Sequence, residues 1–150
     1  MALLDKKPKK ARKKIAQPEF EHQCALILWT TARYEQAPEL WPDLDMIHCS
    51  LSGVKLTAAQ AGKAKAAGMR KGVLDVILDK PIGGYHGLRI EMKAPATPGK
   101  PRGRPTPEQM KEVIRLRALG YRAEFCYGVE EAKAVIRDYY AGGRDVDTSN

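Results

Sequence analysis

Apolar residues along this chain fall into short segments separated by glycine, proline and charged positions. Residues 18–35 begin with a proline, which fits the first turn of a helix. Phe20, Cys24, Ile27 and Leu28 then recur near one helical stripe, so this segment is predicted to be a helix. Residues 44–50 are a short strand candidate.

A second helix is predicted over residues 57–67, with Thr57 as its N-cap and Gly68 as its stop. The central part of the chain then changes to a strand pattern. Residues 73–78 are a continuous apolar run interrupted by Asp75, and residues 88–93 follow a proline- and glycine-containing turn. These two runs are expected to pair like a hairpin.

The last third predicts one loop, two helices and one strand. Residues 94–105 contain four prolines and three cations, which indicates a flexible basic loop. Thr106, Pro107 and Gln109 then have the spacing of a capping box at a helix that runs to about Leu119. A strand over 121–127 and a helix over 130–140 complete an α/β fold with a mixed central sheet flanked by helices.

Composition narrows the class of protein. The chain has 150 residues, 43% of them hydrophobic, and a net charge of +8. This predicts one folded domain with a polyanionic partner, most simply nucleic acid. No apolar run is long enough to span a membrane, which makes a cytoplasmic protein the default. The three cysteines are far apart, so neither a zinc site nor a disulfide framework is expected.

The two ends differ in composition from the rest. Residues 1–17 carry seven lysines and arginines and are expected to form a flexible basic arm, which lies along phosphates or simply keeps the protein soluble. Residues 141–150 are glycine-rich and polar and are expected to be a flexible tail. The folded domain is therefore placed at residues 18–140.

The candidate chemistry lies in the two central strands. Asp75 and Glu91 interrupt apolar strands, and a buried carboxylate needs a cation or hydrogen-bond donors. Glu91 and Lys93 are two residues apart, so they share one face of a strand, with Met92 on the other. Asp75, Glu91 and the backbone carbonyl of Met92 would provide hard oxygen ligands for Mg²⁺ or Mn²⁺, and Lys93 would act on a water or a phosphate oxygen.

This arrangement favours phosphodiester hydrolysis over acyl or glycosidic chemistry. The same residues are also compatible with a simple ion pair between Glu91 and Lys93 on a solvated strand, with Asp75 as an edge charge. The pattern alone does not decide between the two interpretations.

At these positions the chain resembles the VRR-NUC domain, a family of the PD-(D/E)XK nuclease superfamily. The resemblance rests on the sequences GVLD at 72–75, GYHGLRIEMK at 84–93 and TPEQ at 106–109, and it extends over roughly residues 19–140. Short stand-alone members of phage type are the most similar in layout. Leu74 stands where the superfamily often has a proline before the acidic ligand.

The resemblance implies a restriction-endonuclease-like core and a role for each matching residue. Asp75 and Glu91 would be metal ligands and Lys93 the catalytic lysine, while Gln109 would face the site from the next helix. The family also has a glutamate on its first helix, for which Glu19 is the candidate and Glu21 the rival. The implied activity is metal-dependent cleavage of branched DNA, such as four-way junctions, by a homodimer.

Several cations near these residues are candidates for DNA contacts. One group flanks the predicted helix at 57–67, and the other precedes Gln109 in the basic loop. The candidates are Lys55, Arg70, Lys71, Lys100, Arg102 and Arg104. A flap- or nick-directed nuclease, a non-catalytic DNA-binding module and an RNA-associated basic protein remain as alternatives.

Overall fold

The computed structural model describes residues 17–50 and 54–142. The predicted basic arm, apart from residue 17, and the predicted tail from residue 143 lie outside these ranges. The elements, in chain order, are α1 (Pro18–Gln36), the 3₁₀ turn η1 (Leu44–Met46), β1 (His48–Cys49), α2 (Ala58–Ala66), β2 (Val76–Leu78), β3 (Leu88–Lys93), α3 (Pro107–Ala118), β4 (Arg122–Tyr127) and α4 (Val129–Tyr140).

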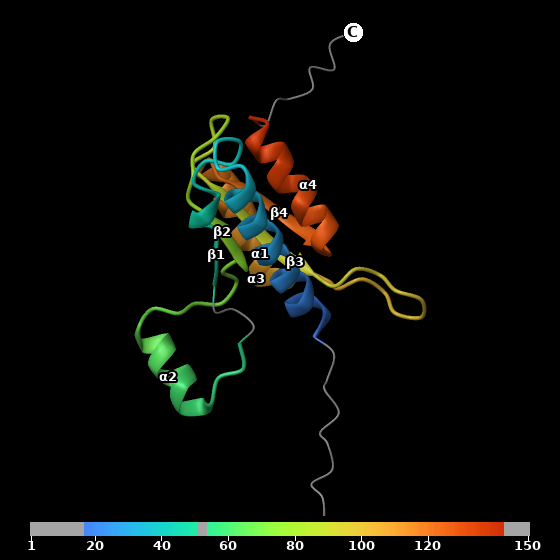
Figure 1. The fold of residues 1–150 in the computed structure, drawn as a ribbon. Helices are drawn as coiled ribbons and strands as arrows, with labels where there is room; N and C mark the ends of the chain where they lie inside the picture. Colours follow the sequence, from blue (N-terminus) through green and yellow to red (C-terminus); the bar gives the residue numbers. More distant parts are fainter. Residues whose placement is uncertain (1–16, 51–53, 143–150) are drawn as a thin grey trace, which may run out of the picture.

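The strands form one mixed sheet in the order β1-β2-β3-β4. β1 and β2 are antiparallel, β2 and β3 are antiparallel, and β3 and β4 are parallel. α1 and α4 pack side by side on one face, and α3 lies on the other (Figure 1). This is the predicted α/β arrangement of a mixed sheet between helices.

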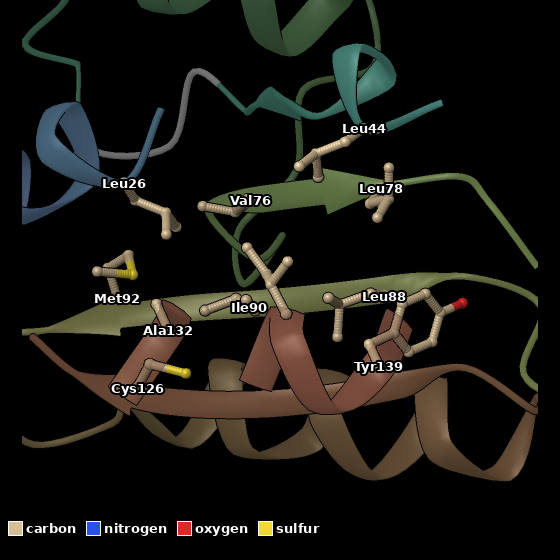
Figure 2. Close-up of a cluster of buried hydrophobic side chains, with 11 residues drawn as sticks. Leu26, Leu44, Val76, Leu78, Leu88, Ile90, Met92, Cys126, Ala132 and Tyr139 are labelled. Atoms are coloured by element: carbon tan, nitrogen blue, oxygen red, sulfur yellow. The ribbon is translucent and has the colours of Figure 1, made fainter. Parts of the chain in front are cut away.

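The main core lies between the sheet and the α1–α4 pair (Figure 2). Ile90 and Met92 of β3, Leu26 of α1 and Ile136 of α4 are fully buried there. A smaller cluster on the other face joins Leu74 to α3 and β4. Since side chains alternate along a strand, Glu91 and Lys93 point away from the main core, toward the α3 face.

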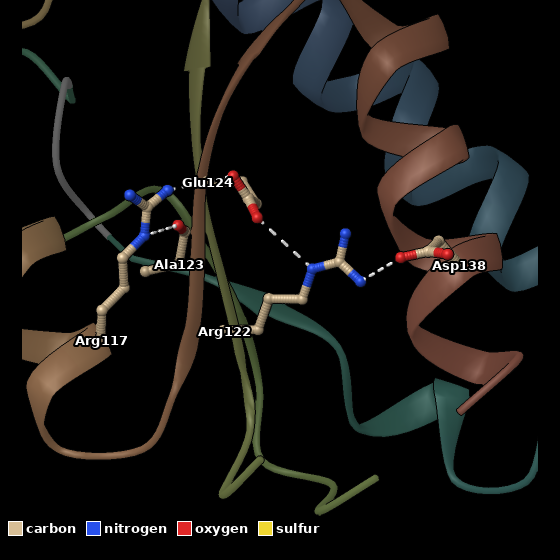
Figure 3. A network of polar contacts seen from close by, with 5 residues as sticks. All are labelled: Arg117, Arg122, Ala123, Glu124 and Asp138. Atoms are coloured by element: carbon tan, nitrogen blue, oxygen red, sulfur yellow. Dashed lines mark hydrogen bonds and ion pairs between the residues drawn. The ribbon is translucent and has the colours of Figure 1, made fainter. Parts of the chain in front are cut away.

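Two arginines fix the helices to β4 (Figure 3). Arg117 of α3 donates to the backbone carbonyl of Ala123 at 2.9 Å and to Glu124. Arg122, at the start of β4, donates to Glu124 and to Asp138 of α4. The strand that supports β3 is thereby joined to a helix on each side.

Two local predictions need correction. The stripe predicted for α1 is not the face that the helix buries, since Phe20 is 57% and Leu28 73% exposed while Leu26 and Thr30 are buried. The predicted strand at 44–50 begins as the turn η1, and only His48–Cys49 pair with β2. Asp43 has a left-handed φ of 61°, and local backbone bonds from Leu44 and Met46 close the turn.

Two segments project from the body of the domain (Figure 1). One contains α2 and joins β1 to β2, and none of the residues of α2 is buried. The other is the basic loop, residues 94–105. Thr97 and Lys100 exchange backbone hydrogen bonds at its tip, and the backbone N–H of Gly103 donates to the carbonyl of Ala94 at its base. The flexibility of this loop stays a prediction.

Candidate active site

The register of β2 and β3 brings the two central acids together. Val76 pairs with Ile90, which places Asp75 beside Glu91. The Oδ2 atom of Asp75 accepts a hydrogen bond from the backbone N–H of Met92 at 3.0 Å. Asp75 is therefore held at the start of β2 with its carboxylate directed at β3, as the sequence predicted, while Met92 points into the main core.

Glu91 is the most deeply buried acid of the site, with only 2% of its surface exposed. Its Oε1 atom lies 3.1 Å from the Nζ atom of Lys93, which is itself 6% exposed. Gln109 of α3 donates from Nε2 to the same Oε1 atom. The Oε2 atom of Glu91 is buried and has no hydrogen-bond partner among the described residues. A buried carboxylate oxygen without a donor is costly, and a cation would relieve this cost.

Burial raises the pKa of both acids, and the charge of Asp75 raises that of Glu91 further. For Glu91, desolvation and the nearby charge of Asp75 raise the pKa to about 7, against the opposing effect of Lys93. For Asp75, desolvation also raises the pKa, while the hydrogen bond from Met92 and the charge of Lys93 oppose it. Two coupled carboxylates with raised pKa values beside a buried lysine are typical of a functional site. The simple surface ion pair, on a solvated strand, is excluded because both partners are buried.

The side-chain amide of Gln109, in the first turn of α3, makes two contacts, one with the N-cap residue Thr106 and one with Glu91. Its Oε1 atom accepts from the backbone N–H of Thr106 at 2.8 Å, and the Thr106 hydroxyl accepts from the backbone N–H of Gln109 at 3.2 Å. This is the predicted capping box. Because the other end of the amide contacts Glu91, the start of α3 is tied directly to the acid pair.

Of the two candidate acids on α1, Glu19 is the one near the site. Both glutamates are exposed, but the charge of Glu19 contributes to the raised pKa of Asp75 and Glu91, and Glu21 is not among the causes of either shift. The Oε1 atom of Glu19 accepts from the backbone N–H of Ala94 at 3.3 Å. Glu19 is thus engaged at the base of the basic loop, next to the acid pair.

The donor set fits a hard divalent cation in its chemistry. Oxygen atoms of Asp75 and Glu91 converge, and one of them is buried without a donor. Within the described ranges, no group of three or more acidic, histidine or cysteine side chains is close enough to hold a metal ion. Further ligands would have to come from the Met92 carbonyl, water or substrate.

The predicted DNA-contacting cations lie on the two projecting segments. Lys55 and Lys71 belong to the α2 segment, and Lys100, Arg102 and Arg104 belong to the basic loop; all five are exposed. Arg102 lies over the ring of Tyr127, 4.4 Å from its centroid. The α2 segment ends at Asp75, which directly precedes β2, and the basic loop begins directly after Lys93, the last residue of β3. Both projections are therefore joined to the site.

Arg70 differs from the other candidate cations. Both of its terminal nitrogens donate to the carboxylate of Glu112 of α3, at 3.0 and 2.6 Å. Its pKa is raised by this contact, while that of Glu112 is lowered. The sequence analysis missed Glu112, because no local pattern indicates a pair separated by 42 residues.

His22, Trp29 and Trp41 make contacts in other parts of the fold. The Nδ1 atom of His22 accepts from the backbone N–H of Val129, while Trp29 and Trp41 pack against each other and the main core. Cys24 is exposed and Cys126 is buried, and the described cysteines are unpaired. None of the described helices is long and apolar enough to cross a membrane.

Together, the mixed sheet and the acid pair with its lysine define the class: an α/β fold of the restriction-endonuclease type with a candidate nuclease site. A solved structure described as a "VRR_NUC domain protein" is similar to this chain, with a TM-score of 0.66 and 29% identity over 86% of this chain and 93% of the other. The resemblance to VRR-NUC domains is thereby confirmed, and it indicates a nuclease domain. No family model and no curated protein matches the chain.

Proposed function

We propose that this protein is a divalent-metal-dependent endonuclease that hydrolyses phosphodiester bonds in branched DNA, with Asp75, Glu91 and Lys93 at its active site. The observation that carries the proposal is the buried Glu91 carboxylate, which contacts Lys93, lies beside Asp75 and keeps one oxygen without a donor. The similarity to a VRR_NUC domain protein supports the same conclusion.

Each residue has a distinct task in this proposal. Asp75, Glu91 and the Met92 carbonyl would hold Mg²⁺ or Mn²⁺, with Glu19 as a further acid at the edge of the site. When bound, such a cation polarises a scissile phosphate and lowers the pKa of a coordinated water.

The other two residues would act through position and charge. The Lys93 ammonium group, fixed by Glu91, would orient the attacking water or stabilise negative charge that develops on the phosphate oxygens. Gln109 would keep Glu91 in place through the contact of its amide with Oε1.

Branched DNA and a homodimer are the finer parts of the proposal. A four-way junction presents two equivalent strands, and a dimer with a two-fold axis would place one active site on each. The basic loop and the α2 segment project beside the site and carry exposed cations, which fits a substrate whose backbone bends away from a single helix axis.

A substrate panel tests the proposal. The full chain is incubated with labelled four-way junction, 5′ flap, nicked duplex and linear duplex, each with Mg²⁺, Mn²⁺ or chelator. We expect metal-dependent cuts in the four-way junction and little cleavage of linear duplex. Preferential cutting of flap or nicked DNA would correct the substrate, and binding without any metal-dependent product would contradict the nuclease assignment.

A further inference from the structure

A groove lies between the α2 segment and the first turn of α3. Its volume is about 930 Å³, and Gln109 lines it together with side chains of residues 54–72. Because the amide of Gln109 also contacts Glu91, this one side chain connects the groove to the acid pair. None of the roles given above to the site residues uses this space.

The wall of the groove is fixed to the domain at the point where the α2 segment returns to the sheet. Gly72 has a φ of +81°, and a Cβ atom there would lie 3.0 Å from the backbone oxygen of Glu108 in α3. The bidentate contact of Arg70 with Glu112 fastens the same return segment. The two contacts fix one wall of the groove, at residues 70–72, against α3.

The lining combines apolar side chains with charged ones, which are three cations and the carboxylate of Glu108. Val54 and Met69 are large apolar residues with 50% and 37% of their surface exposed, and Leu56 lies with them. Lys65 and Lys71 provide positive charge, whereas the charge of Arg70 is compensated by Glu112. Contacts with phosphates account for the cations, but the phosphates of a regular duplex offer no apolar group to cover the three apolar side chains.

We propose that this groove binds a nucleotide that has lost its stacking or pairing partner at the branch point of the DNA substrate, next to the scissile phosphate. An unstacked base exposes apolar faces that pack on aliphatic side chains such as methionine, leucine and valine, while its phosphates contact lysines. The inference rests on the proposed function and adds to it: the groove is the feature that distinguishes DNA with unstacked bases at a branch point, in a four-way junction or a fork, from continuous duplex.

Binding without metal tests the groove separately from cleavage. Fluorescent forked DNA with an unpaired thymidine arm and blunt duplex of equal nucleotide number are titrated with the full chain in chelator. We expect the wild type to prefer the fork, and Met69→Asp to reduce this preference about tenfold. Met46→Asp is the matched control, because Met46 is 50% exposed on η1 and does not line the groove.

The outcomes separate the groove from the rest of the account. A wild type without fork preference, or a Met69→Asp variant that keeps it, would overturn the groove proposal. So would sedimentation showing that Met69→Asp dissociates a dimer while the preference persists, because the groove would then be an interface between copies. A chain that prefers the fork through Met69 but cuts no substrate would contradict the proposed function alone.

Discussion

At the scale of single residues, the surroundings of Glu91 disfavour its negative charge unless a cation binds nearby. Its carboxylate is buried beside a second acid, and one oxygen lacks a donor. Its pKa is raised from 4.5 to about 7, so the folded state binds this proton more tightly than the unfolded chain does. The contribution of Glu91 to stability therefore falls as the pH rises from about 4.5 to about 7.

A bound cation should reverse this pH dependence, because it favours the ionised carboxylate. We predict that Mg²⁺ or Mn²⁺ raises the melting temperature more at pH 8 than at pH 6, and that binding releases protons below pH 7. Thermal denaturation with and without metal at both pH values measures the effect. Glu91→Gln, which cannot ionise, should lose most of it; an equal shift at both pH values in the wild type would contradict the prediction.

Alternation along the strands allowed most of this site to be predicted from sequence. Asp75, Glu91 and Lys93 stood out because charges inside apolar strands need partners, and the period of two residues placed Glu91 and Lys93 together. The buried face of α1 was predicted wrongly, because the spacing of apolar residues does not show which face the sheet covers. Spacing reveals that Phe20 and Leu28 share a face, but only packing decides that Leu26 faces the sheet.

At the scale of elements, α2 and α3 offer a matched pair of helix starts. Thr57 and Gln60 form a capping box on α2, as Thr106 and Gln109 do on α3, but only Gln109 also contacts Glu91. We predict that Gln109→Ala slows cleavage about 10- to 100-fold, because Glu91 loses its positioning contact. Gln60→Ala should leave the cleavage rate unchanged, and rates that fall equally in both variants would refute a positioning role.

The junction between the α2 segment and α3 gives a second element-level prediction. Gly72 and Gly84 have similar positive φ angles of +81° and +84°, but a Cβ atom meets Glu108 only at Gly72. Gly72→Ala should therefore cost about 1–3 kcal/mol more than Gly84→Ala, since the close approach adds to the backbone strain. Urea denaturation of both variants checks the difference, and equal losses would show that the contact is unimportant.

The elements that the sequence predicted well were the helices with capping residues at the start and a glycine after the end. The caps at Thr57 and Thr106 and the glycines after α2 and α3 fixed those helices closely. The η1 turn and the backbone contacts within the basic loop were missed because they depend on Asp43 in a left-handed conformation and on a turn between Thr97 and Lys100. Neither arises from a periodic pattern.

At the scale of the whole molecule, we expect DNA binding to depend more on where the cations lie than on the net charge of +8. If the basic loop contacts DNA phosphates, removing two of its exposed cations should lower the slope of log affinity against log salt by about 2. We predict this for the double variant Lys100→Ala and Arg104→Ala, measured by fluorescence anisotropy in chelator. Lys133→Ala is the control, because this lysine pairs with Glu130 on α4. An unchanged slope in the double variant would place the loop outside the DNA interface.

The groove and the distant contacts of the molecule were beyond the reach of sequence analysis. Arg70 was predicted to contact DNA, yet its guanidinium group is occupied by Glu112, and Met69 and Val54 gave no signal before the fold placed them beside Gln109. Pairs of this kind depend on how the β1–β2 connection folds back against α3.

The most direct test of the account compares Lys93→Ala with the wild type on a labelled four-way junction, under single-turnover conditions with Mg²⁺. The account predicts that the rate of cleavage falls at least about 100-fold, because Lys93 acts only once the phosphate is in place, while affinity for the junction in chelator changes little. A variant that folds, binds the junction and still cuts at a rate near that of the wild type would contradict it.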